Sequence, residues 1–274
     1  MAQGGFSAVV RSGAKGISKH AFHAAEGRCR FESTVFMLAH MRCGSTALSN
    51  VICAHPEICG YGEAQVVYAG EADIGLLAFK SLYNRAWKSD FRFFFDKVLW
   101  NHLDAAAGPE FFNARAVFSC RNPRDTIASI LNLATKSDYM RRFDAAKAAD
   151  YYERRMERLL EMWDRFPPER RIGITHDRMI AETGPVLTEI STMIGLREPL
   201  ANSYASSAPE VKVGVGDPLD AVRYSRIVKK ASAAGRFHEV VDGLPGDQMR
   251  RMSALYAEFR ERVEVAARAR AAVH

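Results

Sequence analysis

The fold is decided by the stretch Phe36-Met-Leu-Ala-His-Met-Arg42-Cys-Gly-Ser45-Thr46-Ala-Leu48. The apolar run from Val35 to Ala39 is typical of a buried strand, and a helical pattern of apolar residues begins at Ala47, after a short loop. A strand, a tight loop and a helix N-terminus form an anion cradle, because the first N–H groups of a helix are unpaired and the helix dipole is positive there. The stretch therefore predicts a site for a ligand that bears phosphate or sulfate.

This loop differs from the phosphate-binding loop of kinases and nucleoside triphosphatases. Their pattern, G-x-x-x-x-G-K-[ST], would need glycine at position 39 and lysine at position 45, where the chain has Ala39 and Ser45. The cation is Arg42, and it comes before the glycine. Short Arg-Gly-Ser runs also occur in ordinary turns, so these residues alone leave a purely structural loop open as the alternative.

The residues after the loop resemble the opening of one enzyme family. The chain continues Asn50-Val-Ile-Cys-Ala-His-Pro-Glu-Ile-Cys-Gly-Tyr-Gly-Glu63. An R-x-G-[ST]-[ST] loop, a helix, an A-H-P-x-[IV] turn and a Gly-Glu pair, in this order, are similar to the PAPS-dependent sulfotransferases, nearest to their bacterial carbohydrate and tyrosylprotein branches. PAPS is 3′-phosphoadenosine 5′-phosphosulfate. The resemblance implies that Glu63 is the catalytic base and that the loop binds the 5′-phosphosulfate through Arg42, Cys43, Gly44, Ser45 and Thr46.

A second segment points to the same family. Ala116-Val-Phe-Ser-Cys120 reads as another buried strand, and it is followed by Arg121-Asn-Pro-Arg-Asp-Thr-Ile-Ala-Ser129. Asn122 is a good N-cap with proline at the first helical position, so a helix is predicted to begin here. The segment resembles the family motif R-[ND]-P-R-D-x-x-x-S, which implies that Arg121 and Ser129 hold the 3′-phosphate of the donor. Without the first motif, this segment could equally be a helix start whose arginines, Arg121 and Arg124, form surface ion pairs.

Two further cations are assigned by the same resemblance. Lys80 ends an apolar run that begins at Asp73 and is predicted to be a strand. It resembles the lysine after the G-[FL]-x-F-K strand of bacterial glycan sulfotransferases and would stabilise the transferring group. Arg223 lies where the family closes a loop over the nucleotide and is assigned to the 3′-phosphate, with Arg226 or Lys229 as alternatives.

The base has two alternatives near the loop. Many cytosolic sulfotransferases use a histidine, and this chain has His40 and His55 nearby. His55 belongs to the His-Pro-Glu turn and His40 to the strand end, so Glu63 is preferred. A glutamate works as a base near neutral pH only if burial raises its pKa.

Strands and helices alternate along the chain. This order predicts a three-layer, P-loop-like α/β fold with a central, mostly parallel sheet flanked by helices, and with ligands at the carboxyl ends of the strands. A strand is expected at 171–176, and helical spacing is expected at 88–103, 144–166, 183–194 and 247–263.

The 274 residues, of which 48% are hydrophobic, suffice for one domain at 31–265. Residues 1–30 are rich in Gly, Ser, Ala and cations and lack an apolar signal-peptide core, so a mobile basic arm is expected, with a targeting or partner-binding arm as the alternative. Residues 266–274 are expected to be a frayed tail.

Composition excludes several other classes. The sequence contains no apolar run of 18 residues, so no transmembrane helix is expected. The net charge of +6 is spread over helices such as Arg154-Arg155, which read as solvated faces, so no nucleic-acid partner is expected. The five cysteines form no C-x-x-C pair and suggest a reducing cytoplasm, with Cys43 as an alternative nucleophile. Neither cysteine nor histidine spacing predicts a metal site.

The resulting hypothesis is a sulfotransferase that moves a sulfuryl group from PAPS to an acceptor hydroxyl, with PAP as product and without a metal. The branch that the chain resembles implies a carbohydrate or glycolipid acceptor, and other small molecules or lipids and a homodimer stay open. The alternatives are a metal-dependent phosphotransferase of P-loop type and a non-catalytic module that binds PAP or PAPS.

Overall fold

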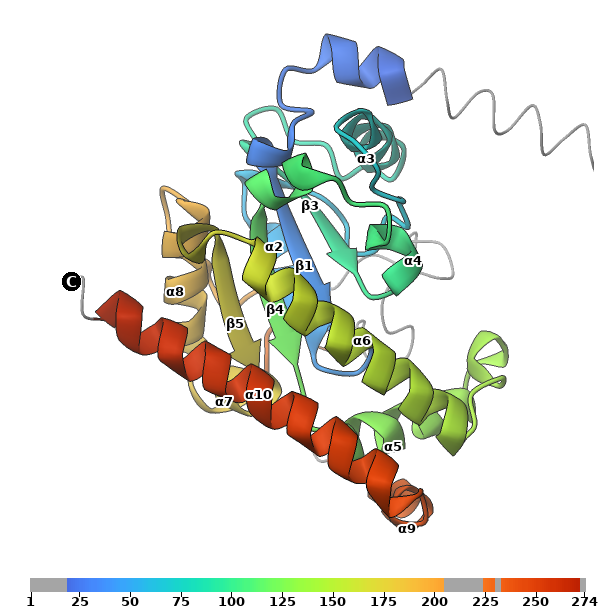
Figure 1. Cartoon of the computed structure of the whole chain (residues 1–274). Coiled ribbons are helices and arrows are strands. Elements are labelled where there is room, and N and C mark those ends of the chain that lie inside the picture. Colours follow the sequence, from blue (N-terminus) through green and yellow to red (C-terminus); the bar gives the residue numbers. More distant parts are fainter. Residues whose placement is uncertain (1–18, 205–223, 230–232, 272–274) are drawn as a thin grey trace, which may run out of the picture.

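A five-stranded parallel sheet forms the centre of the protein, in a computed structural model that describes residues 19–204, 224–229 and 233–271 (Figure 1). Its strand order is β2-β3-β1-β4-β5, and every neighbouring pair is parallel. The strands are β1 (Thr34–Ala39), β2 (Ile58–Cys59), β3 (Phe93–Val98), β4 (Arg115–Cys120) and β5 (Arg171–Thr175). All residues of β1 and β3 are buried, as expected for a parallel sheet covered on both faces. The predicted α/β fold class is confirmed.

Helices cover the two faces of this sheet. In Figure 1, α6 and α10 cross in front of the strands and α2 lies behind β1. The helices are α2 (Ser45–Ala54), α3 (Ala72–Tyr83), α4 (Asn101–Asp104), α5 (Pro123–Ala134), α6 (Ala145–Arg165), α7 (His176–Ala181), α8 (Thr183–Ile194), α9 (His238–Asp242) and α10 (Gly246–Ala271). Short 3-10 turns lie at Phe31–Ser33, Pro109–Asn113, Asp138–Met140, Pro168–Arg170 and Ala233–Phe237. In the described part of the chain, none of these helices has the length and apolar character needed to span a bilayer.

Capping residues begin and end several helices, and Asn122 is the one predicted above. Asn122 Oδ1 accepts a hydrogen bond from the backbone N–H of Asp125 at 2.9 Å, which starts α5 directly after β4. Asp144 caps α6 in the same way through Lys147 N at 2.8 Å. Gly195 ends α8 with a φ of 78°, a left-handed conformation that glycine adopts without a steric penalty.

Two segments differ from the sequence predictions. The run 73–80, predicted as a strand, belongs to α3, and its residues Ile74, Leu77 and Ala78 pack into the core at helical spacing. The run 88–103, predicted as helical, contains β3 and the short α4. A strand buried on both faces carries apolar residues without alternation, so its periodicity does not distinguish it from a buried helix.

The N-terminal boundary also differs. Residues 19–25 are helical and pack on the domain, and Lys19 pairs with Asp73 at 2.6 Å. A Cβ atom at Gly75 would lie 2.0 Å from the carbonyl oxygen of Lys19, so this contact requires a glycine. The guanidinium of Arg28 lies 3.6 Å from the ring centroid of Phe91 and donates to its carbonyl oxygen. The predicted mobile arm is therefore wrong for residues 19–30, whereas residues 1–18 lie outside the described ranges. At the other end, α10 runs to position 271, past the predicted domain end at 265.

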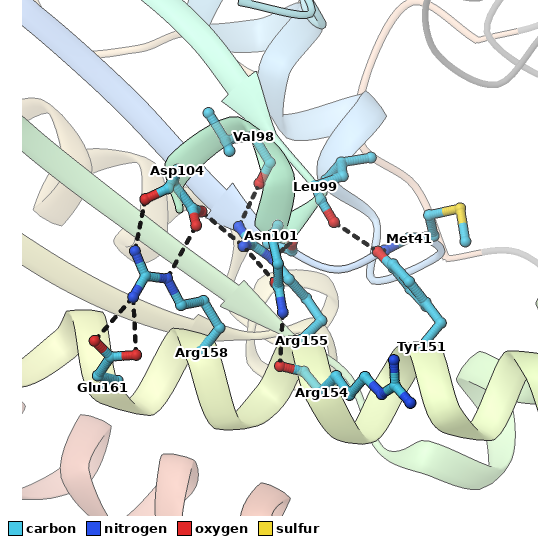
Figure 2. Close-up of polar contacts among 11 residues, drawn as sticks. Met41, Val98, Leu99, Asn101, Asp104, Tyr151, Arg154, Arg155, Arg158 and Glu161 are labelled. Atoms are coloured by element: carbon cyan, nitrogen blue, oxygen red, sulfur yellow. Dashed lines mark hydrogen bonds and ion pairs between the residues drawn. The ribbon is translucent and has the colours of Figure 1, made fainter. Parts of the chain in front are cut away.

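Arg155 was predicted to lie on a solvated helix face. The structure buries it, and its side chain is only 1% exposed. Its guanidinium donates to Asp104 Oδ2 at 2.7 Å and to the carbonyl oxygens of Val98 and Ala39 at 2.8 and 3.0 Å (Figure 2). Val98 and Ala39 are the last residues of β3 and β1. Arg155 thus joins α6 to the carboxyl ends of the two central strands.

Arg155→Ala is expected to lower the free energy of unfolding by about 3 kcal/mol, because it leaves the carboxylate of Asp104 buried beside one remaining arginine, Arg158. The neighbouring Arg154→Ala is the matched control and should change it by less than about 0.5 kcal/mol, since Arg154 is exposed. Urea denaturation of the two variants measures the difference. Equal effects would show that the buried network does not stabilise the fold.

Candidate active site

The loop between β1 and α2 has the conformation expected of an anion cradle. Gly44 has a φ of 89° immediately before Ser45, the first residue of α2. A Cβ atom at Gly44 would lie 2.5 Å from the Met179 side chain and 3.1 Å from the His176 ring, so only glycine fits. Arg42 also has a positive φ, 66°, which is uncommon for a side chain of this size and is often found at functional sites. The first N–H groups of α2 therefore point into the predicted anion site.

A buried lysine at the end of β3 completes this site. Lys97 is 1% exposed, and its ammonium lies 3.0 Å from Glu63 Oε1. It also donates to Thr46 Oγ1, at 3.2 Å, in the first turn of α2. The structure thus brings the predicted base, the predicted hydroxyl ligand and an additional cation into direct contact.

Lys97 was missed from the sequence, although the signal was available. It is the second-last residue of the strand Phe93–Val98, after three phenylalanines, and a cation near the end of an expected strand was part of the basis on which Lys80 was selected. The wrong helical assignment of 88–103 hid it. Lys80 itself lies on α3, and its ammonium donates to the carbonyl oxygens of Ala64 and Gln65 at 2.5 and 3.1 Å. The structure therefore places Lys80 behind the Glu63 segment and not at a strand end.

The segment that carries Glu63 is anchored to β3 by backbone and side-chain bonds. Lys97 N donates to Gly62 O at 3.0 Å, and the buried carboxyl group of Asp96 accepts from Ala64 N at 2.7 Å and from the Tyr68 hydroxyl at 2.6 Å. Burial raises the pKa of Asp96 to about 7, against these hydrogen bonds, which lower it. Glu63 is held next to Lys97 by this network, so its position is set before any ligand binds.

Both alternative histidines are bound to the backbone through both ring nitrogens. The His40 ring bonds Met41 O at 2.8 Å through Nδ1 and accepts from Arg121 N at 2.9 Å through Nε2. Burial lowers the pKa of His40 to about 4, so the ring is neutral and joins the two ligand loops. His55 ends α2 at the opposite end from Ser45 and bonds Glu198 O through Nε2 and Glu57 N through Nδ1. Neither ring has a free nitrogen for an acceptor.

Cys43 is also turned away from the site. It is fully buried, and its thiol donates to His40 O at 3.0 Å. Cys43 can contribute its backbone N–H to the cradle, whereas a nucleophilic thiol would have to face the ligand. All five cysteines are free thiols.

The second predicted motif lies beside the first. Arg42 Nε donates to Ser129 Oγ at 3.0 Å, so a loop residue and a residue of α5 that were assigned to opposite ends of the donor are in contact. Arg121 pairs with Asp125 at 3.1 Å, and its Nε atom is buried without a hydrogen-bond partner in the described ranges. A buried donor without a partner is costly, and an anion would satisfy it. This atom and the unpaired N–H groups at the start of α2 fit a ligand with two phosphate groups.

Side chains from the later part of the chain surround the second motif. His238 of α9 lies 3.2 Å from Asp125 Oδ1, and Asp242 accepts two hydrogen bonds from Arg124 at 2.7 and 2.6 Å. The pKa of His176, at the end of β5, is lowered by burial and by the charge of Arg121. No sequence motif had pointed to His176, His238 or Asp242. Of the predicted C-terminal cations, Arg223 lies outside the described residues, and Arg226 and Lys229 are exposed.

Residues 69–199 match the family model described as the sulfotransferase family. The match agrees with the predicted sulfotransferase family and does not test the carbohydrate and tyrosylprotein branches. The match includes the strand of Lys97 and the whole second motif, from Arg121 to Ser129. No curated protein sequence matches the chain. Within the described ranges, no three His, Cys, Asp or Glu side chains form a group that could hold a metal ion.

Solved sulfotransferases share this fold. The sulfotransferase domain of the Synechococcus PCC 7002 olefin synthase covers 82% of this chain and 94% of its own length, with 17% identity and a TM-score of 0.56. The mouse sulfotransferase SULT7A1, solved in complex with PAP, covers 89% of both chains with 13% identity and a TM-score of 0.53. At these identities the likeness establishes the common architecture, and the assignment of single residues depends on the geometry of the site.

Proposed function

We propose that this sulfotransferase moves the sulfuryl group of PAPS to an acceptor hydroxyl and releases PAP. The observation that carries the proposal is the contact of Lys97 with both Glu63 and Thr46 beside the loop of Arg42. It puts a carboxylate, a buried ammonium and a helix N-terminus at one point. These are the groups that an in-line transfer between two oxygens requires.

The donor would lie across the two motif loops. The N–H groups at the start of α2, with Ser45 and Thr46, would bind the 5′-phosphosulfate, because unpaired helix N–H groups attract anions. Arg121 would turn its unpartnered Nε toward the 3′-phosphate, with Ser129 beside it. Because Arg42 contacts Ser129, it lies between the two groups and can neutralise either.

The chemistry follows from the positions of the charges. Glu63 would accept the proton of the acceptor hydroxyl as its oxygen forms the new bond to sulfur. The bond between sulfur and the bridging oxygen breaks, and its electron pair stays on the 5′-phosphate of PAP. Arg42 and Lys97 would stabilise that negative charge, a role that fixed cations perform in sites shielded from water. When the donor binds, the ammonium of Lys97 would leave Glu63 and pair with the phosphosulfate. The carboxylate of Glu63 would then be free to act as the base.

A carbohydrate or glycolipid is the acceptor proposed from the branch that the motifs resemble. We also propose a cytoplasmic location, supported by the five free thiols, because cysteines stay reduced in that compartment. The proposed chemistry uses side-chain cations and requires no metal.

The donor is tested by comparing PAP with AMP. PAP is expected to raise the melting temperature of the protein more than AMP does, without Mg²⁺, because only PAP has a 3′-phosphate for Arg121. Arg121→Ala should remove this difference, and the exposed Arg260→Ala on α10 should preserve it. Differential scanning fluorimetry at equal ligand concentrations measures the shifts. Equal stabilisation by ATP with Mg²⁺ would favour the metal-dependent phosphotransferase, and binding of PAP without any transfer would favour the non-catalytic module.

A further inference from the structure

A cavity of about 340 Å³ opens between the N-terminal half of α6 and the turn that leads into α4. None of the donor-binding residues lines it. Ligand pockets in proteins span roughly 300 to 1,000 Å³, so this cavity has room for a molecule of about one ring and not for a polymer chain.

The cavity adjoins the proposed transfer centre. Trp100 in its wall follows Lys97 by three residues, so their Cα atoms are at most about 11 Å apart. The hydroxyl of Tyr151, another wall residue, accepts from Met41 N and donates to Leu99 O, both at 2.9 Å (Figure 2). Met41 directly precedes Arg42. The wall is thus bonded to the ends of both strands that carry the reacting groups.

The wall combines aromatic rings with cations. The rings of Trp100 and Tyr151 lie 5.0 Å apart and form the apolar part. Lys147 and Arg154 are four and three residues from Tyr151 on α6, so they share one face of this helix. Arg154 is exposed, and within the described residues its guanidinium has no hydrogen bond or ion pair (Figure 2).

The other charged side chains at the cavity have partners. Lys147 pairs with Asp144 at 3.1 Å, but both side chains are exposed and such pairs are weak. Asp150, the acidic residue of the wall, accepts a hydrogen bond from Gln248 at 3.0 Å. Arg155 is neutralised by Asp104 beneath the wall. The neutral amide of Gln248 does not cancel the charge of Asp150, but the exposed side chains of the wall include two cations, Lys147 and Arg154, and one carboxylate, so their net charge is positive.

We propose that this cavity binds the acceptor, and that the acceptor is a hydroxylated ring that carries an anionic group. The ring packs on Trp100 and Tyr151, the anionic group pairs with Arg154 and Lys147, and the hydroxyl is directed toward Glu63. This inference rests on the proposed sulfuryl transfer. Acidic sugars and phenolic acids both have a hydroxylated ring and an anionic group. An acidic sugar would be a more specific form of the carbohydrate acceptor proposed above.

The test measures binding of small probes to the protein saturated with PAP. The probes are D-glucuronate and 4-hydroxybenzoate, each beside its neutral analogue, D-glucose and 4-hydroxybenzamide. Isothermal titration calorimetry should show at least one anion binding about tenfold or more tightly than its neutral analogue, because hydrogen bonds between oppositely charged groups are stronger than those between a charged group and a neutral one. The anion that binds identifies the source. Equal binding of anion and analogue, or no binding of either anion, would overturn the proposal.

The charge-reversal variant Arg154→Glu should abolish the preference for the anion. Arg268→Glu changes the net charge equally at a side chain that is 80% exposed on α10 and should leave the preference intact. PAP affinity is measured on the same samples and should be unchanged in both variants. If the wild type fails to bind PAP, the proposed function fails. If PAP binds but Arg154→Glu keeps the preference, only the acceptor inference fails.

Discussion

Glu63→Gln is expected to lower sulfuryl transfer by about 10²- to 10⁴-fold, the range that a positioned base contributes. The physical reason is that an amide cannot accept the proton of the acceptor hydroxyl. The substitution keeps the size of the side chain and an oxygen that can still accept from Lys97, which lies 3.0 Å from Glu63 Oε1. Because the proposed donor site consists of Arg42, Arg121 and the start of α2, PAP affinity should stay within a few-fold.

This prediction separates an enzyme from a binding module. A transfer assay from labelled PAPS and calorimetry with PAP, run on one preparation, measure the two quantities. Glu157→Gln is the matched control, since Glu157 lies exposed on α6, and it should alter neither. Normal transfer by Glu63→Gln would exclude Glu63 as the base. Neither His40 nor His55 is then an obvious replacement, because both ring nitrogens of each are bound to the backbone.

Lys97→Met is expected to lower kcat by about 10²- to 10³-fold, the loss found when a preorganised group that stabilises developing charge is removed. The same change leaves the carboxylate of Glu63, 11% exposed, without its partner, so it should also lower the melting temperature. Activity and stability thus fall together, and the single variant cannot separate the two causes.

The double variant Lys97→Met with Glu63→Gln separates them. With both charges of the pair removed, the melting temperature should recover relative to Lys97→Met, whereas transfer should not. Lys88→Met is the control. Lys88 donates to the carbonyl oxygens of Cys53 and His55 at the C-terminal end of α2, away from Ser45 and Thr46 at its start. It should lower stability and leave kcat unchanged. Recovery of transfer in the double variant would show that Lys97 acts only by neutralising Glu63.

Local sequence was sufficient for the two ligand loops. A strand, a loop with Arg42 and Gly44, and a helix that begins at Ser45 are consecutive in the chain, so backbone preferences specify them. The same holds for the second loop, where Asn122 caps α5 at 2.9 Å directly after β4. Both predictions concerned contacts between residues a few positions apart, and both match the structure.

The errors arose where burial overrides periodicity. The spacing of aromatic residues at 88–103 predicted a helix and the apolar run at 73–80 predicted a strand, whereas the structure assigns these segments to β3 with α4 and to α3. Arg155 was read as exposed because charged residues usually are. Its burial depends on Asp104 and on the strand ends of β1 and β3, which lie more than 50 residues away in the chain.

The sequence by itself thus determined the α/β class, the family and the two loops that would hold the donor, because each depends on residues adjacent in the chain. Only the tertiary structure decided which groups lie together at the proposed point of transfer. Lys97, Glu63 and Thr46 come from three segments, and they meet because β3 pairs in parallel with β1 and so brings its carboxyl end beside the loop. The cavity at Trp100 and Arg154 arises in the same way, from the packing of α6 across those strand ends. Contacts between such distant segments cannot be read from a local sequence pattern, since they depend on how apolar surfaces far apart in the chain are buried together.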